Sequence, residues 1–371
     1  MQYLRKIIVA DFRNITLAEL EFSPNVNCVS GNNGEGKTNL LDAIYYLSMT
    51  KSSFSGVDKY NFRYGADSFS ISGTYQMNDG LVSRFAVQVD ASGEKKMRRD
   101  DKPYKKVSDH IGILPIVLVS PADTNLVSES GEERRKFVNA VLSQMDSAYL
   151  HSLQQYNRLL AQRNKLLKEQ TPEQGLLDVL SSRMSALADG IYKSRKEFAA
   201  NILPLLQNYY SLISGGKEEV GLSYSSDLDK APLSDLLDKY RHKDIMFGYT
   251  TTGIQRDDFI FSLNGHPIRS CGSQGQQKSF LVALKFAQYE LLLKGYGFPP
   301  ILLLDDVFDK LDPVRIANLL KMVAGQDFGQ IFITDSNKVR MQAIVDEITS
   351  DRTYYEACAG HFKALEVGRE Q

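Results

Sequence analysis

The segment GNNGEGKT, residues 31 to 38, has the residue types and spacing of a loop that binds phosphate groups. It matches GxxxxGK followed by Ser or Thr, it follows an apolar run, and it opens a helical pattern. Its glycines let backbone N–H groups point inward around phosphates, and the helix N-terminus adds partial positive charge. In such loops the lysine reaches the β and γ phosphates and the hydroxyl ligates Mg²⁺. We therefore predict that ATP is bound by Gly31, Asn32, Asn33, Gly34, Glu35, Gly36, Lys37 and Thr38, with Lys37 also catalytic.

Two carboxylates follow the apolar run ILLL at residues 301 to 304. That pattern is typical of a buried parallel strand that delivers acids to its carboxyl end. Because a phosphate-binding loop is present, we predict that Asp305 is the Mg²⁺ carboxylate. Asp306 stands where a general base could polarise the attacking water, so we predict that it is catalytic. Apolar strands ending in Asp are common, and this prediction therefore depends on the phosphate-binding loop.

The stretch CGSQGQQKSF, residues 271 to 280, places a polar, glycine-containing loop before an apolar helical run. A serine hydroxyl, a glycine N–H and a helix N-terminus together can bind an anion. The same residues can also be a helix cap with nothing bound. The stretch alone does not choose between these two interpretations.

The elements that must position these residues come from both ends of the chain. Residues 1–125 are mostly short apolar or alternating runs typical of strands, with one helix beginning at Lys37. Residues 132–213 have helical spacing with a break near residue 170, which predicts a helical hairpin with arms of about thirty residues, or roughly 45 Å each. After Tyr249 strand and loop signals return. We expect a mixed α/β domain made of residues 1–125 and 246–371, with a helical lobe, 126–245, inserted between them.

Composition sets limits on the class of protein. A chain of 371 residues exceeds the usual size of one core, and 43% hydrophobic with 24% charged residues is ordinary for a globular protein. The net charge of −1 means that any nucleic-acid site must be a local basic patch. Three widely separated cysteines argue against disulfides and zinc, and the five histidines lack ligand spacing. No apolar stretch approaches the length of a membrane span, so we expect a cytoplasmic protein without a membrane partner.

The order of these motifs resembles the ATP-binding-cassette (ABC) ATPases: phosphate-binding loop, SQGQ loop, LLLDD, and then Leu311 with Asp312. In that superfamily a signature loop binds the γ phosphate held by a second subunit. The resemblance implies that Ser273, Gly275 and Gln276 contact ATP bound by another copy, and that the chain forms a homodimer with ATP. It also implies that Asp312 lies at the dimer seam.

Longer segments are similar to the RecF family of bacterial recombination mediators. They are DFRNITLAELEFSPNVNCVSGNNGEGKTNLLDAIYYLS, SPADTNLVSESGEERRKFVN, and RDDFIFSLNGHPIRSCGSQGQQKSFLVALKFAQYE with PPILLLDDVFDKLD. The resemblance implies an ABC ATPase head of the structural-maintenance-of-chromosomes (SMC) type without long arms, and an inserted α-helical lobe. It implies a nucleoid-associated protein of DNA repair, recombination and replication that binds double-stranded DNA and junctions with single strand. It further implies slow DNA-stimulated ATP hydrolysis, RecO and RecR as partners in loading RecA, and contact between Arg13 and nucleotide.

Two departures from the superfamily pattern concern hydrolysis. ABC ATPases usually have a histidine after the strand that follows the signature and carboxylate motifs. This chain has Thr334, Asp335 and Ser336 there, so we expect a weakened or replaced γ-phosphate sensor and slow hydrolysis. The segment SPADTN has no glutamine where the superfamily has one. Asp123 is our candidate for the residue that couples nucleotide to the helical lobe.

Three groups of charged residues are candidates for DNA contact. The first is a basic hairpin that could neutralise phosphates without reading bases, although a solvated hairpin is an equal alternative: Lys95, Lys96, Arg98, Arg99, Lys102, Lys105 and Lys106. The second is a helical group, which a charged outer face explains equally well: Arg134, Arg135, Lys136, Arg158, Arg163, Lys165 and Lys168. The third is Arg256 with Asp257 and Asp258, which could instead form an ion pair at a strand edge.

Two other classes of protein share parts of this pattern. The ATPase subunit of a membrane transporter has the same motif order, but it would have the histidine and the glutamine that are missing here. A metabolic kinase with a phosphate-binding loop would need an acceptor site and would have no use for SQGQQ.

Overall fold

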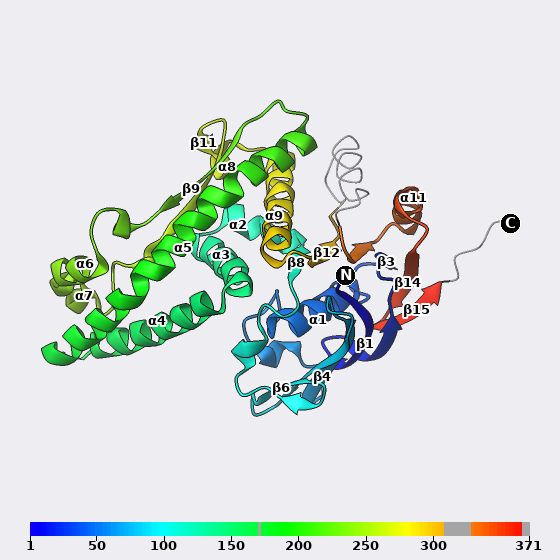
Figure 1. The fold of residues 1–371 in the computed structure, drawn as a ribbon, viewed down its shortest axis with the longest axis horizontal. Helices are drawn as coiled ribbons and strands as arrows, with labels where there is room; N and C mark the ends of the chain where they lie inside the picture. Colours follow the sequence, from blue (N-terminus) through cyan, green and yellow to red (C-terminus); the bar gives the residue numbers. More distant parts are fainter. Residues whose placement is uncertain (170–171, 308–327, 366–371) are drawn as a thin grey trace. The chain divides into compact units, whose positions relative to one another are not determined.

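The computed structural model describes residues 1–169, 172–307 and 328–365, and the chain divides into two compact units. Unit 1 contains Met1–Asp123, the short segment Leu212–Gly215 and the residues from Leu281 onward. Unit 2 contains Thr124–Ser211 and Gly216–Phe280. Both ends of the chain thus build one unit, as the sequence predicts, and many elements of each unit are labelled in Figure 1.

Unit 1 holds two six-stranded sheets. The antiparallel sheet has the order β2-β1-β4-β5-β6-β7, with strands β1 (Tyr3–Phe12), β2 (Ile15–Glu21), β4 (Ser68–Gln76), β5 (Val82–Asp90), β6 (Lys95–Arg99) and β7 (Lys102–Pro103). The second sheet has the order β15-β14-β3-β13-β12-β8, with strands β3 (Val26–Ser30), β8 (Ile116–Val119), β12 (Ile301–Asp305), β13 (Ile331–Asp335), β14 (Arg352–Cys358) and β15 (His361–Leu365). Helix α1 (Lys37–Met49) contacts strands of both sheets, which explains why apolar side chains on several of its faces are buried.

The second sheet brings the predicted chemical residues together. Strands β14, β3, β13, β12 and β8 are parallel to one another, whereas β15 is antiparallel to β14; every residue of β3, β8, β12 and β13 is buried. Their continuous apolar runs are what a sheet covered on both faces requires. Because parallel strands end at the same edge, this edge collects the phosphate-binding loop, Asp305, Thr334 and the segment after β8.

Unit 2 contains the predicted helical hairpin, but its two arms are unequal. Helix α4 (Ser147–Leu166) has 20 residues and α5 (Gln174–Ser214) has 41, and Figure 1 shows them side by side. The unit also holds α2 (Asn125–Ser128), α3 (Gly131–Met145), α6 (Leu233–Lys239), α7 (Arg241–Phe247) and α8 (Ile268–Cys271). In the part of the chain that the structure describes, no helix is both long and apolar enough to cross a bilayer.

The inserted unit differs from the expected helical lobe in content and in its second boundary. It includes a three-stranded antiparallel sheet, β11-β10-β9, formed by β9 (Val220–Ser225), β10 (Asp258–Leu263) and β11 (His266–Pro267). Since β9 pairs with β10 along its full length, the chain on both sides of residue 245 belongs to one unit, which continues to Phe280. Helix α9 (Gln274–Tyr296) therefore begins in unit 2 and ends in unit 1, and α11 (Lys338–Ile348) belongs to unit 1.

Candidate nucleotide site

The predicted phosphate-binding loop joins β3 to α1, and three of its glycines have left-handed backbone conformations. The φ angles of Gly31, Gly34 and Gly36 are 149°, 86° and 108°, which side chains rarely tolerate. A Cβ atom at Gly31 would stand 2.5 Å from the carbonyl oxygen of Ala357, and one at Gly36 would stand 2.9 Å from Asn14 Oδ1. The glycines are therefore required by the path of the loop and by its close neighbours.

Lys37 is the first residue of α1, and its ammonium group is turned into the loop. The Nζ atom donates hydrogen bonds to the carbonyl oxygens of Gly31 (2.8 Å) and Asn32 (3.0 Å), and the residue is only 3% exposed. A cation held within a ring of backbone groups suits an anionic ligand that enters the same loop. The geometry is thus compatible with the predicted contact to phosphate.

The outer side of the loop is held by residues that the sequence analysis did not assign individually. Asn14 Nδ2 donates to the Gly34 carbonyl (3.2 Å), and Asn39 Nδ2 donates to Asn14 Oδ1 (2.7 Å). The Glu35 carboxylate accepts from the backbone N–H of Ala359, and the Glu35 carbonyl accepts from Gly360 (2.9 Å). Contacts from the turn after β1 and from the β14–β15 turn therefore fix the loop, and no pattern local to GNNGEGKT indicates them.

Thr38, Asp305 and Thr334 form a compact group of oxygen atoms at the carboxyl edge of the sheet. Thr38 Oγ1 lies 2.9 Å from both carboxylate oxygens of Asp305, and Thr334 Oγ1 donates to Asp305 Oδ1 at 2.7 Å. Burial raises the pKa of the Asp305 carboxyl above its usual value, while hydrogen bonds from Thr334 and Thr38 oppose that shift. A carboxylate and a hydroxyl are hard oxygen donors, so this donor set fits Mg²⁺.

Asp306 immediately follows β12 and has a left-handed backbone, with φ at 45°. Its N–H donates to the carbonyl (3.3 Å) and Oγ1 (3.2 Å) of Thr334. The Asp305 carboxylate faces Thr38, and the charge of Asp306 adds to the rise in its pKa. The strand end therefore presents two acids in different environments, one buried and one partly exposed.

The segment after β13 shows what stands in place of the usual histidine. Thr334 contacts Asp305, whereas the Asp335 carboxylate accepts from Arg340 Nε (3.0 Å) and Nη2 (2.8 Å) on α11. Asp335 is therefore bound in an ion pair, and Ser336 is exposed. Of the three residues, Thr334 is the one in direct contact with Asp305, the predicted Mg²⁺ carboxylate.

Asp123, our candidate for coupling, lies after β8 and contacts α9. Its Oδ1 atom is 2.7 Å from Lys285 Nζ, and its Oδ2 atom accepts from the Ser120 N–H at 2.7 Å. Lys285 also donates to the Leu118 carbonyl (2.8 Å), although α9 begins at the SQGQ segment. The ion pair thus joins the edge of the nucleotide sheet to the helix that carries the signature residues.

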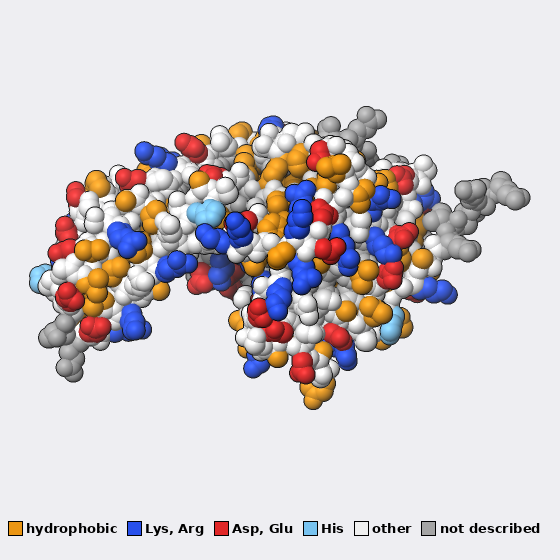
Figure 2. Space-filling view, turned by 60° about the horizontal axis from the view of Figure 1, so that its bottom comes forward, with side chains coloured by type: hydrophobic (Ala, Val, Ile, Leu, Met, Phe, Trp, Pro, Cys, Tyr) orange, Lys and Arg blue, Asp and Glu red, His pale blue; other side chains and the backbone are white. Residues whose placement is uncertain are grey.

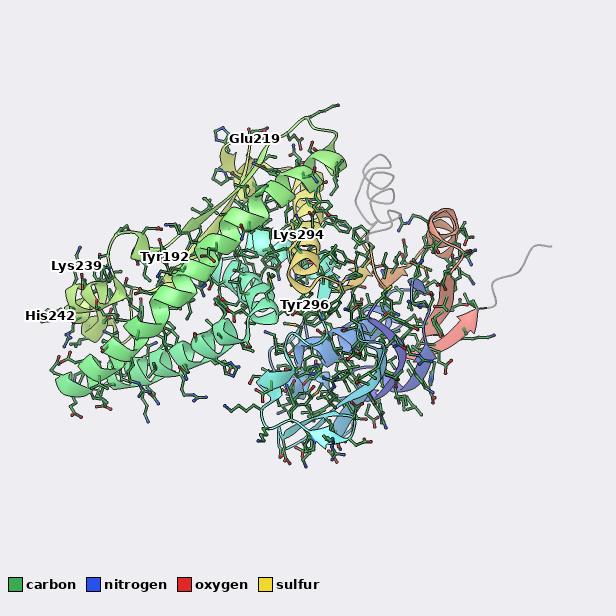
Figure 3. The ribbon with its side chains drawn as sticks, viewed as in Figure 1. Tyr192, Glu219, Lys239, His242, Lys294 and Tyr296 are labelled. Atoms are coloured by element: carbon green, nitrogen blue, oxygen red, sulfur yellow. The ribbon has the colours of Figure 1, made fainter. Side chains whose placement is uncertain are left out.

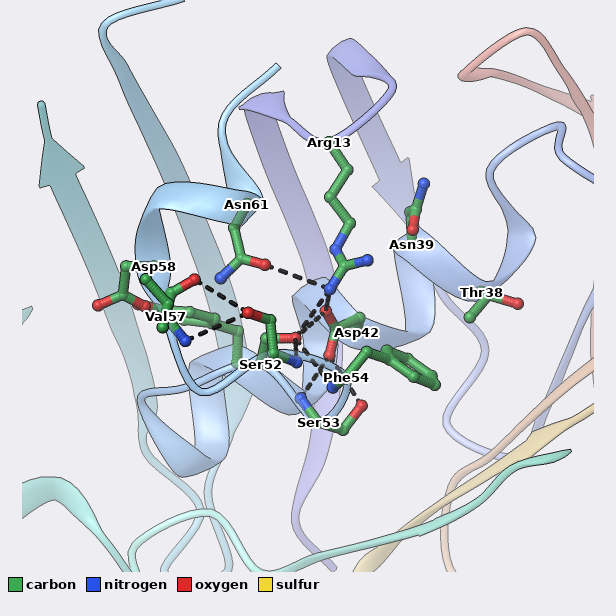
Figure 4. A network of polar contacts seen from close by, with 12 residues as sticks. Arg13, Thr38, Asn39, Asp42, Ser52, Ser53, Phe54, Val57, Asp58 and Asn61 are labelled. Atoms are coloured by element: carbon green, nitrogen blue, oxygen red, sulfur yellow. Dashed lines mark hydrogen bonds and ion pairs between the residues drawn. The ribbon is translucent and has the colours of Figure 1, made fainter. Parts of the chain in front are cut away.

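Arg13 lies in a polar network centred on Asp42 of α1 (Figure 4). Its Nη2 atom is 3.0 Å from Asp42 Oδ2 and donates to Ser52 Oγ (2.9 Å) and Asn61 Oδ1 (3.2 Å). The Asp42 side chain is fully buried, so the guanidinium neutralises an otherwise uncompensated charge. In this structure Arg13 ties α1 to the segment that precedes β4, and its predicted contact with nucleotide remains a prediction.

The SQGQ segment begins α9 and forms a capping box. The Gln276 N–H donates to Ser273 Oγ (3.3 Å), and the Ser273 N–H donates to Gln276 Oε1 (2.7 Å). Gln276 Nε2 also donates to Glu218 Oε1 at 2.7 Å, within unit 2. The cap interpretation of Ser273 is therefore correct as local structure, and it leaves the residue exposed. Asp312 lies outside the described residues.

The basic hairpin forms as predicted, with Asp100 and Asp101 at its turn, but its cations face both sides of the sheet. Lys95 is 2.8 Å from Asp58 and lies over the Tyr46 ring, while Arg99 lies over the Phe85 ring. The alternation of side chains along β6 turns Lys96 and Arg98 outward. The exposed members are Lys96, Arg98, Lys102, Lys105 and Lys106. Figure 2 shows that basic side chains on the drawn face are interspersed with acidic ones.

Structural ion pairs account for much of the second and third charged groups. Arg134 Nε and Nη2 donate to the two oxygens of Asp258 (2.8 and 3.0 Å), and Arg135 donates to the Asp257 carbonyl (2.6 Å). Arg163 is buried and pairs with Asp244 at 2.7 Å. Asp257 and Asp258 do form ion pairs, but with Arg195 and Arg134 and not with the neighbouring Arg256. Lys136 pairs with Glu132 and Glu133, which leaves an exposed remainder: Arg158, Lys165 and Lys168.

Comparison with known proteins shows which family combines these features. Residues 3–354 match the RecF/RecN/SMC N terminal domain family. A DNA replication and repair protein RecF of Bacteroides thetaiotaomicron is 42% identical over 99% of this chain and 100% of its own length. The chain belongs to the RecF family. A RecF of Flavobacterium johnsoniae is 42% identical over 92% of this chain and 96% of its own length.

Solved structures agree with this assignment. RecF with ATP, described as the recombination mediator protein of the RecFOR pathway, matches with a TM-score of 0.88 and 28% identity over 98% of both chains. The SMC head domain of Pyrococcus furiosus matches with a TM-score of 0.59 and 16% identity over 100% of this chain and 97% of that one, which shows the fold alone. The predicted ABC and SMC type of ATPase fold is confirmed.

Proposed function

We propose that this RecF-family chain is an ATP-driven DNA clamp of recombinational repair and replication-fork maintenance. In this proposal ATP joins two copies on double-stranded DNA, and hydrolysis separates them. The observation that carries the proposal is the arrangement of Lys37, Thr38 and Asp305 around one loop, within a chain that has a single signature segment.

Different residues of the site would bind the phosphates and the Mg²⁺. Lys37 and the backbone N–H groups of residues 31 to 38 would hold the phosphates. Thr38 and Asp305 would hold Mg²⁺, which when bound neutralises phosphate charge. The donor set supports this assignment because it consists of oxygen atoms already within hydrogen-bonding distance of each other.

Asp306 is the proposed general base. Its carboxylate follows the Mg²⁺ carboxylate directly, and a base at this position would accept a proton from the attacking water at a carboxylate oxygen. Thr334 would orient Asp305 through its 2.7 Å hydrogen bond, but a hydroxyl cannot provide the charge-dependent contact of a histidine. Slow hydrolysis is therefore expected, and from the family resemblance we propose that DNA stimulates it.

Dimerisation would complete the site. The Ser273 hydroxyl is exposed at the start of α9, and Gly275 and Gln276 lie in the first turn, where N–H groups and the helix dipole favour an anion. Each chain has one such segment and one phosphate-binding loop, so two copies arranged head to tail would form two equivalent sites.

The biological setting follows from the family. The relatives are named DNA replication and repair proteins, and the solved RecF belongs to a pathway with RecO and RecR. We infer that this chain acts with RecO and RecR to load RecA at junctions between double-stranded and single-stranded DNA. The exposed cations of the β6–β7 hairpin are the proposed duplex contacts, and the bacterial cytoplasm, in association with the nucleoid, is the proposed location.

Sedimentation velocity on Asp306→Asn tests the proposal. Removing the base should trap the ATP state, so we expect monomer without nucleotide and with ADP, and dimer with ATP and Mg²⁺. Lys37→Ala, introduced into the same background, serves as the control and should remain monomeric. If Asp306→Asn remains monomeric with ATP bound, both with and without duplex DNA, the clamp proposal is wrong.

A further inference from the structure

The end of unit 2 formed by α6, α7 and the last turn of α4 carries exposed aromatic side chains next to cations. The side chain of Phe247 is 50% exposed and that of Tyr249 is 44% exposed. Met246, the residue before Phe247 on α7, is 73% exposed. Figure 3 shows the neighbouring Lys239 and His242 on the outer surface of α6 and α7. None of these residues has a role in the proposed nucleotide site.

Contacts between lysine ammonium groups and aromatic rings join these residues into one surface. Lys239 Nζ is 5.5 Å from the centre of the Tyr240 ring, and Lys243 Nζ is 5.7 Å from the same ring and 6.0 Å from that of Phe247. The rings of Phe247 and Tyr249 are 5.9 Å apart. Three rings and two ammonium groups are therefore contiguous.

The surface continues onto α4 through the residues around Tyr249. Gly248 packs against Lys168, since a Cβ atom on Gly248 would lie 3.5 Å from Lys168 Cγ, and the Thr250 N–H donates to Asn164 Oδ1 at 2.8 Å. The exposed Lys165 of α4 and Lys168, which follows that helix, thus extend the same surface, and Arg158 lies farther along α4.

Acidic side chains lie near this surface, and cations within the protein neutralise only some of them. Asp244 is buried against Arg163 at 2.7 Å, and Asp178 and Asp238 both pair with Arg241, at 2.5 and 2.8 Å. Glu169 is exposed beside Lys168. Asp235 on α6 is exposed as well, and Arg241 balances only one of its two carboxylate partners. The surface therefore places exposed lysines, interspersed with a few carboxylates, beside partly exposed rings.

We propose that this surface, defined by Lys165, Lys168, Lys239, Tyr240, Lys243, Met246, Phe247 and Tyr249, binds single-stranded nucleic acid. Cations track the phosphates of a single strand, and aromatic rings stack on its unpaired bases without reading their sequence. Bases within a duplex are already stacked on each other, so exposed rings favour a single strand over a duplex. The inference extends the proposed function, because it gives the strand beyond the end of a duplex a separate binding place.

Fluorescence anisotropy with a labelled oligothymidylate, without nucleotide, measures this binding independently of the clamp. An abasic oligomer of equal length serves as the second probe, because it has the phosphates but no bases. Phe247→Ala with Tyr249→Ala should weaken oligothymidylate binding about tenfold or more, and it should leave abasic binding unchanged. Ile260→Ala, which alters a similarly exposed side chain on β10, should leave the affinities for both oligomers unchanged.

The charge contribution is tested separately. Lys239→Glu with Lys243→Glu should weaken the binding of both oligomers. It should also reduce the slope of log K against log salt by about 0.7 for each lost phosphate contact. Lys193→Glu, on the exposed face of α5, is the control and should leave both affinities unchanged.

Three outcomes would overturn the proposal: no measurable binding of oligothymidylate, equal binding of the abasic oligomer by the native protein, or full affinity in the aromatic double variant. Loss of a protein partner by that variant, with oligothymidylate affinity intact, would identify a protein-docking surface instead. Since no ATP is present, failure here leaves the clamp proposal standing, and failure of the ATP-dependent dimer leaves this proposal standing.

Discussion

At the scale of single residues, two buried titratable groups differ in the partners that they meet. Asp305 is buried but is reached by two hydroxyl groups at the edge of the nucleotide sheet. His110 is also buried, but its neighbours are the Leu47 carbonyl, 2.6 Å from Nε2, and the Tyr104 hydroxyl, 3.2 Å from Nδ1. The sequence analysis treated the histidines as ordinary residues, and His110 is a core residue of this kind.

His110 should make stability depend on pH. Burial lowers its pKa from 6.5 to about 4, with the charge of Arg99 adding to the shift and the bond to Leu47 opposing it. Between these values the unfolded chain binds more protons, so the stabilisation is complete above pH 6.5 and is lost as the pH falls towards 4. The total is about 3 kcal/mol. Urea unfolding at pH 7 and pH 5 should show a smaller loss in His110→Gln than in the native protein, and equal losses would contradict this assignment.

At the scale of elements, contacts distant in sequence fix where α5, α9 and the strands of unit 2 lie. Arg195 on α5 is buried and donates to Asp257 Oδ2 and the Ile254 carbonyl, both at 2.6 Å, just before β10. Tyr224 on β9 donates to the same Asp257 oxygen. This network joins the helical hairpin to the three-stranded sheet, and it explains why they form one unit.

Arg195→Met should destabilise the protein strongly. The substitution leaves the buried Asp257 without its cation, which costs about 3–5 kcal/mol in comparable sites. Lys196→Met, at the next position, removes only an exposed, solvent-screened pair with Asp229 and should cost much less stability than Arg195→Met. Denaturant unfolding of the two variants measures the difference, and similar losses would mean that the buried network does not hold the unit together.

Ser273→Arg tests whether the start of α9 has a function beyond capping. A bulky cation at this exposed position should abolish ATP-dependent dimers while the monomer still binds ATP through its own loop. Loss of the cap alone should cost about 1 kcal/mol of stability and leave dimerisation intact. Ser182→Arg, at an exposed position on α5, is the control for adding a bulky cation to the surface. Sedimentation with ATP in the Asp306→Asn background distinguishes the results, and dimers in Ser273→Arg would limit the segment to a helix cap.

At the scale of the whole molecule, a net charge of −1 is compatible with DNA binding only if the cations are distributed unevenly. The outward cations of the β6–β7 hairpin form one local group in unit 1. The exposed lysines at the end of unit 2 form another. The two groups differ chemically because only the second has contiguous exposed rings, so the first suits phosphates alone.

Lys96→Glu with Arg98→Glu should weaken ATP-dependent binding of duplex DNA and reduce its salt slope by about 0.9 for each lost phosphate contact. Both side chains point away from the buried face of β6, so stability should change little. Lys59→Glu with Lys363→Glu makes the same charge change at exposed positions elsewhere in unit 1. Anisotropy titrations at several salt concentrations measure the slopes, and equal slopes in the two variants would place the duplex site elsewhere.

The sequence by itself determined the features that depend on a continuous segment. The phosphate-binding loop needs its glycines, Lys37 and Thr38 at fixed spacing, and a buried parallel strand needs an apolar run, so GNNGEGKT and ILLLDD indicated their structure directly. The same reasoning indicated that both ends of the chain form one unit. Local spacing carries this information because backbone geometry relates neighbouring residues rigidly.

Only the tertiary structure decided the features that depend on packing between distant segments. Lys95 and Lys96 are adjacent in sequence, but the pleat of β6 turns one towards Asp58 and leaves the other exposed. Arg163 and Lys165 differ in the same way, because α4 packs one side against Asp244. The three-stranded sheet of unit 2 likewise depends on pairing between β9 and β10 across two intervening helices. The sequence determines which residues carry charge. The tertiary structure determines which partner each charged side chain contacts, because it decides which surfaces pack together.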